Sequence, residues 1–182
     1  MSKKVFVFLA EGFEEIEALT SVDLLRRAGI VCTTVSIGDS LEVTGSHGIK
    51  VFADRFFDEA ECMKGDAVIL PGGMPGTINL SKHYGVKNVV IDYNKRNKLI
   101  ASICAAPTIL GEMGLLEGLK STCYPGMENK LYGSDVIDEA YVKDGNFLTS
   151  KGVGTAIDFA LKIIEILEDD NLKENIKTQI VY

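Results

Sequence analysis

One cysteine, Cys104, stands where a thiol could act as a nucleophile. It follows the apolar run 99–103 directly and precedes Ala105, Ala106 and Pro107. Proline suits the first turn of a helix because the N–H that it lacks is not needed there. Strand, tight turn and helix in this order would place the sulfur near unpaired helix amides, which stabilise a thiolate. A buried structural cysteine is the alternative, but the strand–turn–helix order favours a functional role.

The other three cysteines show no pattern of their own. Cys32, Cys62 and Cys123 are widely spaced, no C-x-x-C pair is present, and the chain has two histidines. A disulfide framework or a zinc site is therefore not expected, and neither is any other metal or cofactor. We interpret these cysteines as packing residues in a protein of the reducing cytoplasm.

Carboxylates cluster near the N-terminus, at Glu11, Glu14, Glu15 and Glu17. Because acidic side chains favour the first turn of a helix, we expect three of the four to be solvated there. Glu17 lies about one helical turn on from Glu14, and its neighbour Ile16 begins an apolar stripe. The pattern allows Glu17 to point either into a cleft or out to water.

Two glycine-rich segments have more than one interpretation. Gly72 and Gly73 could form only a tight turn, or their backbone N–H groups could form an oxyanion hole together with the amide after Cys104. Gly152 and Gly154 resemble a phosphate loop, but neither of the two common nucleotide-binding glycine motifs is present. Nucleotide binding is therefore not predicted.

Apolar runs alternate with helical patterns along the whole chain. The patterns predict main strands at 4–9, 31–37, 66–70 and 99–103, a short hairpin or a pair of edge strands at 42–52, and a hairpin at 136–149. They predict helices at 14–28, 77–81, 86–95, 105–113, 155–167 and 171–177. Strands that alternate with crossover helices indicate a mostly parallel sheet covered on both faces. We expect one domain over 1–182, with its site outside the carboxyl ends of the strands.

The overall composition restricts the partners. The formal net charge is −7 and the pI about 4.9, which disfavours nucleic acid and anionic membranes. The first apolar run, 5–10, is followed at once by glutamates, so it is not the apolar core of a signal peptide. No run approaches the roughly 18 apolar residues that a membrane span requires.

Four collinear motifs resemble the ThiJ/PfpI superfamily, in its DJ-one (parkinsonism-associated) branch. They are the segments 10–17 (Ala-Glu-Gly-Phe-Glu-Glu-Ile-Glu), 70–73 (Leu-Pro-Gly-Gly), 103–107 (Ile-Cys-Ala-Ala-Pro) and 148–155 (Leu-Thr-Ser-Lys-Gly-Val-Gly-Thr). The resemblance implies a flavodoxin-like three-layer sandwich, a homodimer and a nucleophile at Cys104. It also implies that Glu17 is a buried glutamate bonded to the sulfur, and that the amides of Gly73 and Ala105 line the pocket.

The chain departs from the family pattern at one position. Many relatives have a histidine before a proline where this chain has Tyr124 before Pro125. A Cys–His dyad is not available by this correspondence, so protease activity is not expected. Tyr124 remains a candidate substrate contact, and Glu17 is the one obvious group for proton transfer.

A cysteine and a buried glutamate can act together. An ionised carboxylate would raise the thiol pKa, whereas a protonated one can donate to the thiolate, so the pair shares a proton. The resemblance implies a cofactor-independent glyoxalase or deglycase that acts on methylglyoxal-type dicarbonyls or early glycation adducts in carbonyl stress. The alternative is a non-enzymatic, stress-protective (chaperone-like) redox sensor in which Cys104 oxidises to sulfinate beside Glu17.

Overall fold

A seven-stranded sheet forms the centre of the computed structural model, which describes residues 2–182. Its order is β10-β11-β7-β6-β1-β2-β5. The strands are β1 (Lys4–Leu9), β2 (Val31–Ser36), β5 (Arg55–Phe56), β6 (Ala67–Leu70), β7 (Leu99–Ile103), β10 (Tyr141–Asp144) and β11 (Phe147–Ser150). All neighbours pair in parallel except β10 with β11. The predicted mostly parallel sheet is thus confirmed.

Two small sheets lie outside the main one. β3 (Glu42–Thr44) and β4 (Lys50–Phe52) form the predicted antiparallel hairpin, and β8 (Lys120–Ser121) pairs in parallel with β9 (Asp135–Val136). The second predicted hairpin, at 136–149, is shorter than expected because β10 begins only at Tyr141.

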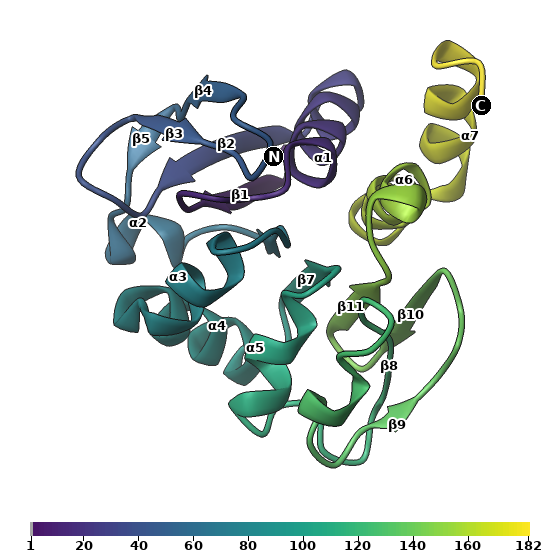
Figure 1. The fold of residues 1–182 in the computed structure, drawn as a ribbon. Coiled ribbons are helices and arrows are strands. Elements are labelled where there is room, and N and C mark those ends of the chain that lie inside the picture. Colours follow the sequence, from purple (N-terminus) through teal and green to yellow (C-terminus); the bar gives the residue numbers. More distant parts are fainter. Residues whose placement is uncertain (1) are drawn as a thin grey trace.

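Helices cover both faces of the main sheet (Figure 1). On one face lie α1 (Glu15–Arg27), α6 (Ala156–Leu167) and α7 (Asp170–Gln179). On the other lie α2 (Glu59–Cys62), α3 (Gly76–Lys82), α4 (Tyr84–Lys95) and α5 (Pro107–Glu112). Short 3₁₀ turns occupy Glu128–Lys130 and Val153–Thr155. The flavodoxin-like three-layer sandwich is confirmed.

The core has two parts because side chains alternate across the sheet. Val5 and Val7 of β1 pack with the α1–α6 cluster, whereas Phe6 and Phe8 pack with the cluster under α4. Every residue of β6 and β7 is buried, as expected for parallel strands covered on both faces.

Helix α1 does not bury the stripe that its spacing predicts. Val22 and Leu25 are buried, but Ile16 and Leu19 are 53% and 37% exposed. The start of the helix instead turns Glu17 and Ala18 inward. The first turn of α1 therefore directs a carboxylate, and not the expected isoleucine, into the protein.

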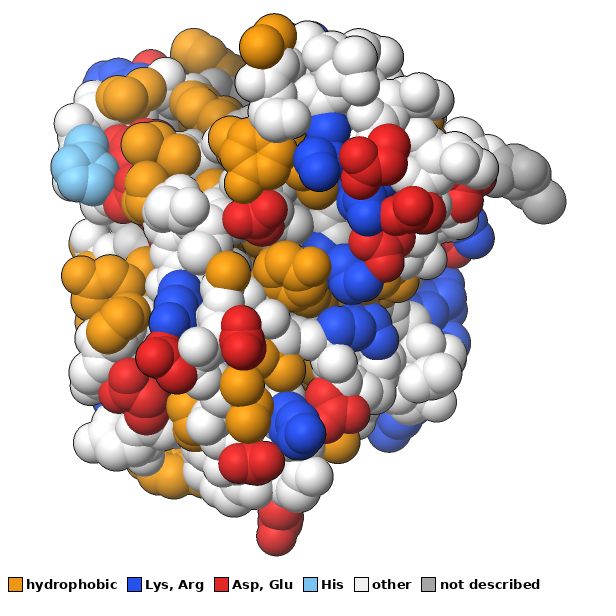
Figure 2. All heavy atoms as spheres, turned by 90° about the vertical axis from the view of Figure 1, so that its right-hand side faces the viewer, with side chains coloured by type: hydrophobic (Ala, Val, Ile, Leu, Met, Phe, Trp, Pro, Cys, Tyr) orange, Lys and Arg blue, Asp and Glu red, His pale blue; other side chains and the backbone are white. Residues whose placement is uncertain are grey.

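The surface shows no segregated charge on the side that Figure 2 presents, where Lys and Arg side chains are interspersed with Asp and Glu among apolar patches. Over residues 2–182, none of the helices is both long enough and apolar enough to cross a membrane.

The strand order determines where a site can form. The chain proceeds from β1 outward to β2 and then returns to the other side of β1 to place β6, β7 and β11. At such a reversal the loops that leave neighbouring strands separate and leave a crevice. The segments that follow β1, β6 and β7 carry Glu17, Gly72 and Cys104, respectively.

Candidate active site

Cys104 occupies a strained turn directly after β7. Its φ is 64°, a left-handed conformation that residues other than glycine rarely adopt. The Cys104 N–H donates to the Ser150 carbonyl at 2.9 Å, and its own carbonyl accepts the Tyr124 N–H at 2.8 Å. These bonds hold the strained conformation, and strain of this kind clusters at functional sites. The predicted tight turn is therefore present.

The helix after Cys104 is shorter than predicted. Residues 105–113 were expected to be helical, but α5 covers only Pro107–Glu112, with Pro107 in its first turn. A six-residue helix that starts three positions after the cysteine provides little dipole at the sulfur. Instead, the individual N–H groups of Ala105 and Gly73 act on the sulfur and favour its thiolate form.

Glu17 points inward from α1 and is 0% exposed. Its Oε2 accepts the Gly72 N–H at 2.9 Å, and its Oε1 is buried without a hydrogen-bond partner among residues 2–182. Burial raises the pKa of Glu17 to about 7, although the Gly72 N–H and the hydrogen bond to Cys104 act in the opposite direction. The question that the sequence left open is thus answered, because Glu17 faces the interior.

Cys104 is not a freely ionised thiolate, in contrast to the expectation from the helix dipole. Burial, followed by the charge and hydrogen bond of Glu17, raises the pKa of the thiol to about 12, and the N–H groups of Ala105 and Gly73 offset only part of this. Two adjacent anions are therefore disfavoured at neutral pH. The pair shares one proton, and the thiolate exists when that proton lies on Glu17.

Gly72 lies in close contact with the side chains of Cys104 and Glu17. A Cβ at Gly72 would lie 2.6 Å from the Cys104 Cβ and 2.8 Å from Glu17 Oε2, so no larger residue fits. Its N–H is already used by Glu17. Gly72 could act as an oxyanion-hole donor only if this bond were broken, whereas the N–H of Gly73 acts on the sulfur and lowers the thiol pKa.

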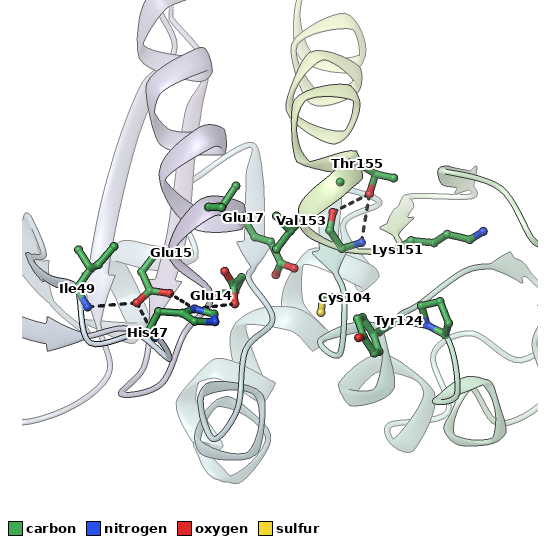
Figure 3. A pocket seen from close by; sticks show the side chains of 14 residues that line it. Glu14, Glu15, Glu17, His47, Ile49, Cys104, Tyr124, Lys151, Val153 and Thr155 are labelled. Carbon is green, nitrogen blue, oxygen red and sulfur yellow. Dashed lines mark hydrogen bonds and ion pairs between the residues drawn. The ribbon is translucent and has the colours of Figure 1, made fainter.

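The sulfur opens into a cavity of about 700 Å³ (Figure 3). Glu17, Tyr124 and Val153 line it near Cys104, and His47 lines it from the β3–β4 turn. Tyr124 is 51% exposed. Lys151 also lines the cavity, but its ammonium group is paired with Asp138. The cavity at Cys104 is thus lined by groups from at least four segments of the chain.

Two glutamates expected to be solvated are buried. Glu14 and Glu15 are 8% and 3% exposed, whereas Glu11 is exposed as predicted. The Glu15 carboxylate accepts the backbone N–H of His47 at 2.8 Å and that of Ile49 at 3.3 Å. Burial alone would raise the pKa of Glu15, but these bonds and the His47 ring lower it to about 2.

His47 was missed as a site residue. The predicted hairpin at 42–52 placed it in a turn, but nothing in the sequence showed that this turn reaches the cavity. Glu14, Glu15 and His47 bring one possible metal-ligand atom each within 4.8 Å of one another. Both Glu15 oxygens already accept hydrogen bonds, which a metal would have to displace. We therefore interpret the cluster as a hydrogen-bonded anchor.

Cys104 is the one partly exposed thiol of the four. Cys32 lies in β2 and Cys62 ends α2. Cys123 follows the two-residue strand β8. All three are buried.

The chain is similar to known proteins over most of its length. The model of the DJ-1/PfpI family matches residues 3–166. Protein dj-1beta of Drosophila melanogaster is 40% identical over 169 residues, which are 92% of this chain and 90% of that protein. A protein of Pyrococcus abyssi named a deglycase is 29% identical over 168 residues, 91% of this chain and 99% of its own.

Solved structures show the same fold over the full length. A mutant of a DJ-1 superfamily protein from Salmonella typhimurium aligns with a TM-score of 0.92 at 36% identity, covering 99% of this chain and 98% of its own. Oxidised DJ-1 of Toxoplasma gondii aligns with a TM-score of 0.92 at 32% identity, covering 100% and 99%. The chain described here is therefore a member of the DJ-1/PfpI family.

Proposed function

We propose that the chain is a cofactor-independent, cysteine-dependent glyoxalase or deglycase that acts on methylglyoxal-type dicarbonyls or early glycation adducts. One observation carries the proposal: the Cys104 sulfur and the protonatable carboxyl group of Glu17 meet in one cavity, where Glu17 Oε1 has no hydrogen-bond partner among residues 2–182. Family membership and the deglycase name of the Pyrococcus relative support it.

The mechanism follows from the shared proton. The Cys104 thiolate adds to the aldehyde carbon while Glu17 protonates the carbonyl oxygen, which forms a hemithioacetal. The Glu17 carboxylate then transfers a proton between the two adjacent carbons, and a thioester results. The N–H groups of Gly73 and Ala105, which lower the pKa of the thiol, would also stabilise the charge that develops on the substrate oxygen. Water finally releases a hydroxy acid.

Turnover of methylglyoxal without glutathione tests the proposal. We expect the wild-type chain to produce the hydroxy acid and a Cys104→Ser variant to produce none. Cys62→Ser is the matched control, because it removes a buried thiol that does not line the cavity. Turnover that persists in Cys104→Ser would exclude a cysteine mechanism.

A redox sensor is the second candidate. Cys104 is the partly exposed thiol, and the donors at its sulfur would also stabilise a sulfinate. The Toxoplasma relative is described as oxidised. Mild peroxide should add two oxygens to the Cys104 peptide, as seen by mass spectrometry. Oxidation confined to methionines, with Cys104 intact, would contradict this role.

A further inference from the structure

The β3–β4 turn that carries His47 is attached to the first turn of α1. The backbone N–H groups of His47 and Ile49 both donate to Glu15 Oε1, at 2.8 Å and 3.3 Å. A Cβ at Gly45 would lie 2.3 Å from the Glu15 carboxyl carbon, so glycine allows the carboxylate to lie beneath the turn. The anchor holds the imidazole at the wall of the cavity that contains Cys104 (Figure 3).

Glu15 also determines the orientation of the ring. His47 Nδ1 lies 3.0 Å from Glu15 Oε2, and Glu15 is ionised at neutral pH because its pKa is lowered to about 2. An ionised carboxylate can only accept, so Nδ1 carries a proton and the neutral ring keeps its lone pair on Nε2. A buried carboxylate at Nδ1 is the arrangement that orients a general-base histidine in hydrolases.

We propose that His47, oriented by Glu15, is a further catalytic residue: the general base for the water that hydrolyses the Cys104 thioester. This inference rests on the proposed function. His47 would provide, from the opposite wall of the cavity, the imidazole that the chain lacks at Tyr124.

The step balances without a further reactant. The water oxygen attacks the acyl carbon, one O–H bond breaks, and its proton moves to His47 Nε2. The carbon–sulfur bond then breaks and Cys104 leaves with the electron pair. The new carboxylic acid returns its proton to the Cys104–Glu17 pair, and the imidazolium releases the other proton to solvent.

The charges around the ring predict how this step depends on pH. Glu15 contacts Nδ1, and Glu14 Oε2 lies 3.5 Å from it, both from the start of α1. The other charged groups of the cavity are Glu17, beside Cys104, and Lys151, which is paired with Asp138. The hydrogen bond to Glu15 and the nearby carboxylates raise the pKa of His47. Hydrolysis of the thioester should therefore become faster as the pH rises, with an apparent pKa above the ordinary value of histidine.

Rapid-quench kinetics with methylglyoxal can separate thioester formation on Cys104 from its release. His47→Asn keeps a donor for Glu15 but removes Nε2. We expect the thioester to form at the normal rate in this variant. Its hydrolysis should be slower by about 10²-fold or more, and the hydrolysis rate should no longer rise with pH. In Glu15→Gln, the rise of the hydrolysis rate with pH should occur at lower pH. The matched control is His83→Asn, because His83 caps α4 and asparagine also caps helices.

The outcomes separate the role of His47 from the formation of the thioester on Cys104. If His47→Asn releases product as fast as wild type, or slowly with an unchanged pH profile, His47 is not the base. Release unchanged in His47→Asn but slowed in His83→Asn would also overturn the role. If the wild-type chain forms no thioester on Cys104, the proposed function fails, and this role fails with it.

Discussion

Burial and the charge of Glu17 together raise the pKa of the Cys104 thiol, and Glu17 itself has no exposure to solvent. The same carboxyl group accepts the Gly72 N–H through Oε2, which leaves Oε1 unpaired among residues 2–182. The Glu17 carboxyl group is therefore fixed in place, and an oxygen able to exchange a proton remains available.

Replacing Glu17 should separate thiol reactivity from catalysis. Glu17→Gln keeps a hydrogen-bond donor but cannot transfer a proton, so dicarbonyl turnover should fall by ~10²–10⁴ while Cys104 is still alkylated. Tyr124→Phe should have only a small effect, because phenols are poor proton acceptors at neutral pH. Steady-state rates for both variants provide the measurement. Full turnover in Glu17→Gln would remove the proton-transfer role.

The buried carboxyl group should also make stability depend on pH. Its pKa is about 7 in the folded chain against an ordinary value of 4.5, so its contribution is complete below about pH 4.5 and is lost as the pH rises through 7. This difference corresponds to at most about 3 kcal/mol. Urea unfolding should show that the free energy of unfolding of Glu17→Gln rises relative to that of the wild type between pH 5 and pH 8. Glu11→Gln, at an exposed position, is the control. If the stability of Glu17→Gln and of the wild type changed with pH in the same way, the raised pKa of Glu17 would be contradicted.

Iodoacetamide at neutral pH should modify Cys104 before the other cysteines. The pKa does not rank the thiols, because burial raises it to about 12 for Cys32 and Cys104 and to about 11 for Cys62 and Cys123. Access to the reagent decides the order, and only Cys104 is partly exposed. Peptide mapping over time measures the order, and faster labelling of Cys62 or Cys123 would refute it.

We expect a homodimer that uses α1. Ile16 and Leu19 expose apolar surface on this helix, with 53% and 37% of each residue accessible. Leu19→Asp should therefore shift sedimentation toward the monomer at micromolar concentration. Ile91→Asp is the matched control, because Ile91 is 38% exposed on α4, on the other face of the sheet. A monomeric mass for the wild-type chain would disprove this expectation.

Local patterns were sufficient for the elements that hold Cys104. The runs at 4–9 and 99–103 agree with β1 and β7 in both bounds, since each strand is buried, apart from Lys4, and ends where the apolar residues end. The turn at Cys104 follows from the absence of a spacer between that strand and Pro107. Such features depend on neighbours within a few residues, which a sequence displays directly.

Contacts between distant segments decided the rest of the site. His47 and Glu15 are 32 residues apart in the chain, and their bond exists only because the β3–β4 turn folds onto α1. The raised pKa of Cys104 has burial as its main cause, and burial depends on how the layers pack. The glutamate spacing is the same for a solvated helix start and for a buried one. Packing alone distinguishes them, because it determines which carboxylates lose water and which donors replace it.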